Sequence, residues 1–227
     1  MAIDLKVRTV YLSKEDPVMD GAAFKESFIE RQYVARFKGA TVVDLGAHKG
    51  YFGAYALVNG AATVLSYEPE SRNFSYLARA ASGPDRGQSW VAHHCAVGSV
   101  DGEAMLKVAR GSWSHSFLTR DVSTGEEQNV EVRSLDRILV EAALLDPDWL
   151  IVKIDIEGSE CDVVLHTNAG LWRIVDEVLV EHHNFAPCTW EELMERFTQL
   201  GFVAPGEVSG DVHRLVRDPP GATQTLA

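Results

Sequence analysis

Short runs of apolar residues alternate along this chain with stretches in which apolar side chains recur at helical spacing. The runs predict buried strands, and the helical spacing predicts amphipathic helices that cover them. The predicted strands lie at 40–45, 64–68, 90–97, 150–156 and 178–183, with a last, antiparallel pair at 201–203 and 212–216. The helical patterns lie at 24–37, 52–58, 71–81, 135–142, 161–165 and 190–200. This alternation favours an α/β fold, a mostly parallel sheet with helices on both faces and ligands at the carboxyl ends of the strands.

Three segments depart from the alternation. Residues 1–39 are expected to form an N-terminal helical segment, because apolar residues between Phe24 and Phe37 share one helical face. The stretch 103–132 holds two short apolar runs around a polar loop, which predicts an inserted hairpin with its loop near the site. The tail 218–227 is expected to be flexible. No linker or internal repeat divides the chain, so a single domain over 1–227 is predicted.

The most informative segment is the turn after the first predicted strand. Asp44 lies in the end of that strand, and Gly46 and Gly50 follow before a helical pattern begins. Glycines in such a turn let a ligand approach the backbone at a helix N-terminus. The spacing differs from the Gly-x-Gly-x-x-Gly of dinucleotide-binding turns. A carboxylate at position 44 suits a positively charged amino group instead, and an adenosyl-amino-acid cofactor carries one.

A second acidic residue stands at the end of the next predicted strand. Glu68 comes 24 residues after Asp44, and Pro69 ends the strand because it has no N–H for the ladder. A carboxylate about 20 residues beyond the first turn is placed to accept hydrogen bonds from ribose hydroxyls. The two features together predict a nucleoside-binding site.

Composition narrows the classes of function. The chain has 227 residues, which suits one α/β domain, and its 21 basic and 33 acidic residues give a net charge of −12. That charge argues against a nucleic-acid partner, which selects a basic face. A membrane partner is not expected either, because no apolar run approaches the ~20 residues of a membrane span. Cys95, Cys161 and Cys188 are too few and too scattered to predict a disulfide framework, so a cytoplasmic location is expected.

Five motifs stand at or near predicted strand ends: Val43–Gly50, Tyr67–Pro69, Ala96–Gly98, Ser134–Asp136 and Lys153–Glu160. Together they resemble the FkbM family of S-adenosylmethionine-dependent methyltransferases. The resemblance runs from about Thr41 to His183. It implies a Rossmann-like class I methyltransferase fold, with a seven-stranded sheet whose last strand is antiparallel, and methylation of hydroxyls on sugars or other natural-product intermediates. His48 stands where members of the family commonly carry Asn.

The resemblance and the positions of the motifs assign the site. The expected contacts to S-adenosylmethionine are Asp44, Gly46, Ala47, His48, Gly50, Tyr51, Glu68, Pro69, Ala96, Val97 and Asp155. Of these, Asp155 ends the fourth parallel strand, and we expect it to bind the cofactor's ammonium or to position the acceptor. His182 and His115 are the other catalytic candidates, since histidine titrates near neutrality. Because neighbouring strand residues face opposite sides, only one of His182 and His183 is expected to face the site.

Other interpretations stay open at this stage. Lys153 and Glu157 flank Asp155 and can form an internal ion pair that only fixes the turn. Mg²⁺ held by Asp155, Glu181 and Asn184 is an alternative, although no metal is expected.

The expected function is O-methylation of a small molecule. The alternatives are N- or carboxyl-methylation, an NAD-dependent oxidoreductase, and a non-catalytic nucleoside-binding protein. The aromatic face of the N-terminal segment is expected to cap the site or to form a homodimer.

Overall fold

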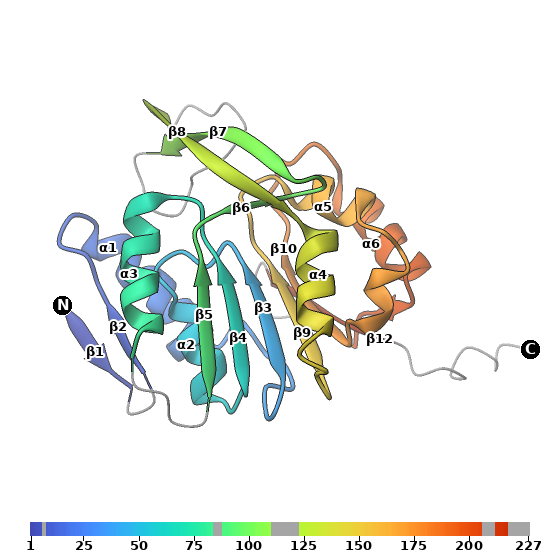
Figure 1. The fold of residues 1–227 in the computed structure, drawn as a ribbon, viewed down its shortest axis with the longest axis horizontal. Helices are drawn as coiled ribbons and strands as arrows, with labels where there is room; N and C mark the ends of the chain where they lie inside the picture. The colour runs from blue at the N-terminus through green and yellow to red at the C-terminus, as the bar shows by residue number, and fades with distance from the viewer. Residues whose placement is uncertain (6–7, 84–87, 110–122, 206–211, 218–227) are drawn as a thin grey trace, which may run out of the picture.

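Seven strands form one twisted sheet at the centre of the computed structural model (Figure 1). Their order across the sheet is β11-β12-β10-β9-β3-β4-β5. The bounds are Thr41–Leu45 for β3, Thr63–Tyr67 for β4, Ser89–His93 for β5, Leu150–Ile154 for β9, Glu177–Glu181 for β10, Phe202–Val203 for β11 and Val212–Arg217 for β12. Strands β5, β4, β3, β9 and β10 pair in parallel, whereas β12 pairs antiparallel with β10 and β11. The predicted mostly parallel sheet with an antiparallel last strand is confirmed.

The structure describes residues 1–5, 8–83, 88–109, 123–205 and 212–217. The α-helices in these ranges are α1 Pro17–Lys25, α2 Tyr51–Val58, α3 Ser71–Ala81, α4 Leu135–Ala143, α5 Glu160–His166 and α6 Trp190–Gln199. A single turn of 3₁₀-helix spans Leu171–Ile174. None of the helices in these ranges has both the length and the apolar character needed to cross a bilayer.

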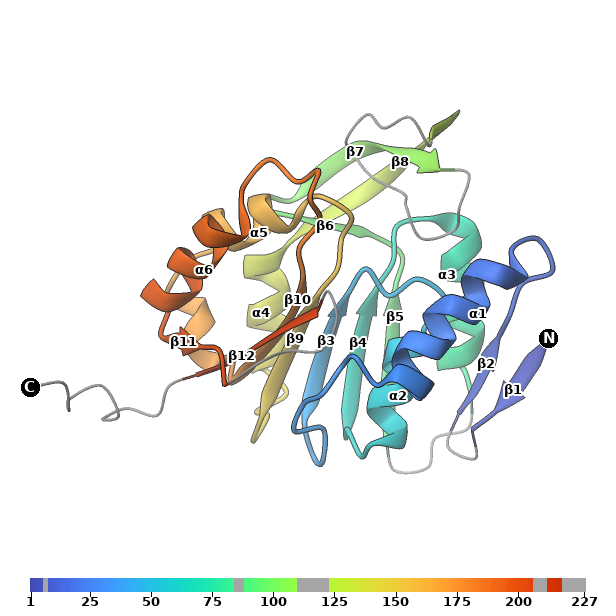
Figure 2. The ribbon, with the colours of Figure 1, turned by 180° about the vertical axis from the view of Figure 1, so that it is seen from behind.

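Helices cover both faces of the sheet because successive strand residues point to opposite sides. Val43 of β3 lies in one buried cluster with residues of α4, α5 and α6, such as Leu139 and Phe197. The neighbouring Val42 lies in a second cluster with Phe52 of α2 and Leu77 of α3. Figures 1 and 2 show the two helical layers on either side of the strands. Burial of each such side chain stabilises the fold by about 1.5–3 kcal/mol relative to exposure.

The N-terminal 39 residues differ from the predicted helical segment. Strands β1 (Ala2–Asp4) and β2 (Thr9–Tyr11) pair antiparallel, and within the described residues 1–5 and 8–39 only α1 and a π-helical turn at Glu26–Glu30 are helical. The helix ends at Arg31, whose φ of 54° is left-handed. The chain then runs to β3 without helix.

The aromatic residues between Phe24 and Phe37 pack against α2. Phe24 and Phe28 contact the rings of Tyr51 and Tyr55 on α2, at centroid distances of 6.3 and 5.5 Å. Tyr33, in the non-helical part, lies 4.8 Å from Phe52. The apolar spacing therefore reflects burial against α2 and not one continuous helix.

The predicted strand at 90–97 is wrong, because the chain divides it between two sheets. The main-sheet strand β5 ends at His93, and β6 (Ala96–Gly98) pairs with β8 of a three-stranded sheet instead. The last amide of the β4 segment that bonds to β5 is Glu68 N, to His93 O at 3.1 Å. Amides that face β5 alternate along the strand, so the next one is Glu70 N, and it donates to Glu68 Oε1 at 2.8 Å instead. The ladder between β4 and β5 therefore ends at Glu68.

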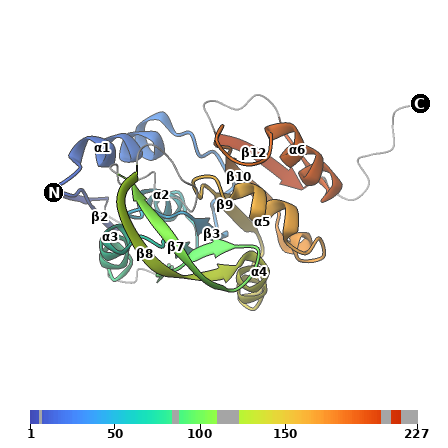
Figure 3. The same ribbon diagram turned by 90° about the horizontal axis from the view of Figure 1, so that it is seen from above.

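The expected hairpin is the antiparallel pair of β7 (Gly102–Ala109) and β8 (Ser123–Ser134). Figures 1 and 3 show its sheet lying over the carboxyl ends of the central parallel strands. The loop 110–122, which contains His115, lies outside the described residues, and so does the tail 218–227.

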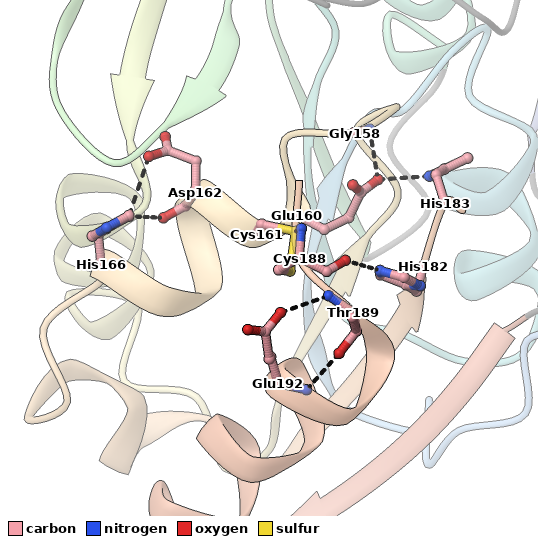
Figure 4. Close-up of a disulfide and its surroundings, with 10 residues drawn as sticks. All are labelled: Gly158, Glu160, Cys161, Asp162, His166, His182, His183, Cys188, Thr189 and Glu192. Carbon is pink, nitrogen blue, oxygen red and sulfur yellow. Dashed lines mark hydrogen bonds and ion pairs between the residues drawn. A yellow bond between two sulfur atoms is a disulfide. The ribbon is translucent and has the colours of Figure 1, made fainter. Parts of the chain in front are cut away.

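A disulfide joins Cys161 of α5 to Cys188, which precedes α6 (Figure 4). The sequence predicted no disulfide framework, and the expected cytoplasmic location depended on that prediction, so this bond corrects its premise. The two residues are 27 apart in sequence, but the loop after β10 returns across the start of α5 and brings their Cα atoms to 5.8 Å. The sequence separation of the two cysteines does not predict this path of the loop. Cys95 is a free, buried cysteine.

Reduction of this disulfide is expected to lower the free energy of unfolding by about 3 kcal/mol, because it removes a cross-link that closes a loop of this size. Denaturant unfolding with and without dithiothreitol measures the change. The double substitution Cys161→Ala with Cys188→Ala is the control, and its unfolding should no longer respond to dithiothreitol. If dithiothreitol destabilises that variant as much as the wild type, the loss of stability does not come from reduction of this disulfide.

Candidate active site

The turn after β3 has a backbone that constrains which residues can occupy it. Gly46, His48 and Gly50 all have positive φ, at 75°, 51° and 88°. A Cβ on Gly46 would lie 1.7 Å from the backbone oxygen of Asp155, so this turn packs directly on the end of β9. The amides of Gly46 and Ala47 both donate to Tyr67 O at the end of β4. The turn is therefore fixed to both neighbouring strand ends.

Glu68 links this turn to the next one. Its carboxylate accepts hydrogen bonds from His48 N and Glu70 N, both at 2.8 Å, and the residue is 5% exposed. Burial raises the pKa of Glu68 to about 8, against the two backbone hydrogen bonds that lower it. A carboxylate has about four lone-pair sites, so two remain for further donors. The structure thus brings together the two features that predicted the nucleoside site.

Asp44 lies beneath the turn and not on its surface. It is fully buried, with Lys153 Nζ 3.4 Å from its Oδ1 and the hydroxyl of Ser66 donating to its Oδ2 at 3.0 Å. Lys153 also contacts Asp155 at 3.1 Å and donates to Gly46 O at 2.7 Å. Burial lowers the pKa of Lys153, but the charges of Asp155 and Asp44 outweigh it and raise that pKa.

Lys153 therefore supplies the cation that was expected to come to Asp44 from the amino group of the cofactor. The internal ion pair considered from the sequence is present, and it joins Lys153 to the carboxylates of Asp155 and Asp44. Glu157 contacts His183 instead, with 3.7 Å between its Oε1 and the Nε2 of the imidazole.

Asp155 lies at the centre of a group of charged side chains that includes His183. His183 is held by Glu160, whose buried Oε1 lies 2.7 Å from His183 Nδ1 and accepts a hydrogen bond from Gly158 N (Figure 4). The same oxygen also accepts from Ile156 N. The other ring nitrogen, Nε2, faces Asp155, Glu157 and Glu181. Burial lowers the pKa of His183, but the hydrogen bond to Glu160 and the charge of Asp155 raise it to about 9.

His182, the predicted catalytic candidate, lies on the other side of this strand end. Its Nε2 lies 2.9 Å from Cys188 O, and its ring is 6.2 Å from that of Trp190. Figure 4 shows the two imidazoles directed to different partners. Of the two histidines, His183 is the one that the structure brings to Asp155.

The remaining predicted cofactor contacts lie around the turn or beside it. Tyr51 is buried, and its hydroxyl donates to Tyr11 O of β2, so its ring packs under the turn. Ala96 and Val97 are buried in β6, just beyond the end of β5. Near them, His94 stacks on Phe74 at 4.4 Å, and its Nε2 lies 3.1 Å from the carbonyl oxygen of Pro69.

Sequence reasoning missed two side chains that shape the site. Glu160 was noted only as the end of a motif, although its place at the start of a helix is typical of a carboxylate that binds backbone amides. Gln128 of β8 donates to Glu70 Oε1 and accepts from Ser71 N, which ties the small sheet to the turn after β4. No sequence signal marked Gln128.

Comparison with known proteins places the chain in a family. The model of the methyltransferase FkbM domain matches residues 44–204. A protein of Beauveria bassiana (strain ARSEF 2860) named "Methyltransferase 1" is 29% identical over 179 residues, covering 69% of this chain and 71% of that protein. The crystal structure of methyltransferase FkbM from Methylobacillus flagellatus KT superposes with a TM-score of 0.55 at 17% identity. The superposition covers 85% of this chain but only 47% of that one, so this chain spans about half the length of that relative. The chain belongs to the FkbM methyltransferase family.

Proposed function

We propose that this protein transfers the methyl group of S-adenosylmethionine to a hydroxyl group of a small-molecule acceptor. The observation that supports this most is the hydrogen bond from His48 N to Glu68 Oε2, which joins the glycine turn after β3 to the acidic residue after β4. In a methyltransferase of this fold, that pair of turns is suited to a nucleoside that carries an amino acid.

The residues present fit such a cofactor. Glu68 keeps carboxylate lone pairs that the backbone amides do not use, and ribose hydroxyls are suitable donors to them. Gly46 and Gly50, both with positive φ, let the turn pack tightly on Asp155 O and on the Trp90 ring, where a Cβ would clash, and this holds the turn's backbone at the strand ends. Asp155, with its side chain 23% exposed, is the carboxylate best placed to meet an ammonium or an acceptor. When bound, S-adenosylmethionine supplies a methyl group on a sulfonium.

The protein's own contribution is to hold the acceptor in line and to keep water away. The sheet of β6, β7 and β8 lies over the strand ends and contacts the turn after β4 through Gln128. We propose that Asp155 and His183, at the ends of β9 and β10, face the acceptor. His115, which lies outside the described residues, stays a candidate catalytic residue.

Replacing Glu68 by Ala is expected to weaken the binding of S-adenosylhomocysteine by more than about tenfold, because each lost charge-assisted hydrogen bond costs about 1.5–3 kcal/mol. Isothermal titration calorimetry above pH 8, where the Glu68 carboxyl is ionised, measures the affinity. Glu68→Gln keeps one acceptor oxygen, so its affinity for S-adenosylhomocysteine should lie between those of Glu68→Ala and the wild type. Equal affinity of a folded Glu68→Ala variant and the wild type would exclude the ribose contact.

Turnover needs a separate test. The protein is incubated with S-adenosylmethionine and a panel of hydroxylated small molecules, and mass spectrometry detects products that have gained one CH₂ unit. A methyl ether product supports the proposal, whereas a methyl ester or methylamine product would move the acceptor to a carboxylate or an amine. Binding of NAD in place of S-adenosylhomocysteine would contradict the proposal altogether.

A further inference from the structure

Beside the proposed cofactor turn, the ends of β9 and β10 bring together three side chains that commonly bind metals. The ligand atoms of Asp155, Glu181 and His183 all lie within 4.8 Å of one another. Glu181 was one of the ligands considered for Mg²⁺ from the sequence, but the third member here is an imidazole and not the amide of Asn184. The described part of the chain holds one other such group, Cys161, His182 and Cys188, whose two sulfurs are joined in the disulfide.

The orientation of His183 is the observation that distinguishes this group from a solvated acidic patch. Its Nδ1 is held by Glu160, a residue that is 0% exposed and is itself anchored by two backbone amides. Metal-binding histidines commonly make this hydrogen bond to a carboxylate, which fixes the ring and directs the other nitrogen to the ion. Here that other nitrogen, Nε2, points to the carboxylates (Figure 4 shows the His183–Glu160 pair).

The distances around Nε2 leave room for an ion. It lies 3.7 Å from Glu157 Oε1, 3.8 Å from Glu181 Oε1 and 4.0 Å from Asp155 Oδ1. These separations exceed the ~3.2 Å limit of an N–H···O hydrogen bond. Ligands at about 2.1 Å from an octahedral ion lie about 3.0 Å apart when adjacent and about 4.2 Å apart when opposite. The observed separations fall within that range.

The charge of the group also favours a cation. Four carboxylates, those of Asp155, Glu157, Glu160 and Glu181, surround the one imidazole. Lys153 contacts Asp155 through Oδ2, which leaves Oδ1 on the side of His183.

We infer that Asp155, Glu181 and His183 form a binding site for one divalent cation of the Mn²⁺ type, with Glu160 as the residue that positions His183. Mn²⁺ suits a set with one imidazole nitrogen and carboxylate oxygens, whereas Mg²⁺ prefers oxygen ligands alone. The role of the ion rests on the proposed function: at the ends of β9 and β10 it would hold the acceptor hydroxyl by its oxygen.

The test uses the full chain, freed of metal with EDTA and titrated with MnCl₂ by calorimetry. One Mn²⁺ per chain is expected to bind, with affinity lowered at least about tenfold in His183→Ala and in Glu181→Gln. His166→Ala is the matched control, because His166 also lies beside a carboxylate, Asp162, but on the exposed side of α5. The affinity of His166→Ala for Mn²⁺ should equal that of the wild type. Since Glu181 is 28% exposed, Glu181→Gln keeps the test valid if His183→Ala does not fold.

Absence of saturable Mn²⁺ binding, or equal affinity in folded His183→Ala and wild type, would overturn this inference. The same metal-free protein is titrated with S-adenosylhomocysteine. Binding of the nucleoside without binding of Mn²⁺ refutes the metal site alone, and binding of Mn²⁺ without the nucleoside refutes the proposed function alone.

Discussion

Replacing Asp44 by Ala is expected to lower the free energy of unfolding by about 3–5 kcal/mol, one of the largest effects of any single substitution in this chain. Asp44 is fully buried, and the side chain of Lys153 is only 3% exposed. Removal of the carboxylate leaves the lysine charge in the core with fewer counter-charges, at a site where water cannot replace them. Because Lys153 also donates to Gly46 O, the turn after β3 should loosen and cofactor binding should weaken by more than about tenfold.

A double substitution separates the cost of a stranded charge from the cost of lost packing. Asp44→Ala with Lys153→Met removes both charges, and the loss of stability should be smaller than the sum of the two single losses. Denaturant unfolding of the four proteins gives the cycle. Additive losses would mean that the two side chains do not depend on each other, and the buried ion pair would then have no energetic role.

The second large effect is expected at Gly46. In Gly46→Ala the new Cβ would lie 1.7 Å from Asp155 O, a backbone atom that cannot rotate away, and φ is +75°. The left-handed conformation costs about 1–2 kcal/mol, and the overpacking adds about 1–3 kcal/mol. We therefore expect a loss of about 3 kcal/mol or more in the free energy of unfolding, together with loss of cofactor binding.

Gly39 offers a matched control for this substitution. Its φ of +77° is nearly the same, but a Cβ there would meet nothing within 4 Å. In Gly39→Ala the free energy of unfolding should fall only by the cost of the left-handed backbone, about 1–2 kcal/mol. This variant should bind S-adenosylhomocysteine like the wild type. If the two variants lose equal stability, the contact between the turn and the end of β9 is not the reason for glycine at position 46.

The features that could be predicted from the sequence are those with a local signal. Strand β3, Gly46 and Gly50 follow one another within a few residues, and Glu68 with Pro69 marks the end of the next strand by composition alone. The parallel order of the sheet followed from strands separated by helices. Asp155 could be placed at a strand end for the same reason.

What could not be predicted depends on contacts between distant parts of the chain. The Lys153 amine reaches Leu45 O across 108 residues, and it takes the position beside Asp44 that a cofactor ammonium was expected to take. The pairing of Cys161 with Cys188 depends on the path of the loop after β10. Whether His182 or His183 meets Asp155 depends on the path of the chain just after β10. The alternation of side chains along a strand predicted only that one of the two would face the site.

A crystal structure of the protein soaked with S-adenosylhomocysteine tests the central claim most directly. The predicted result is density for the nucleoside across the ends of β3 and β4, with both ribose hydroxyls within hydrogen-bond distance of the Glu68 carboxylate. Density at another part of the molecule, or strand ends that stay empty at saturating ligand, would contradict it.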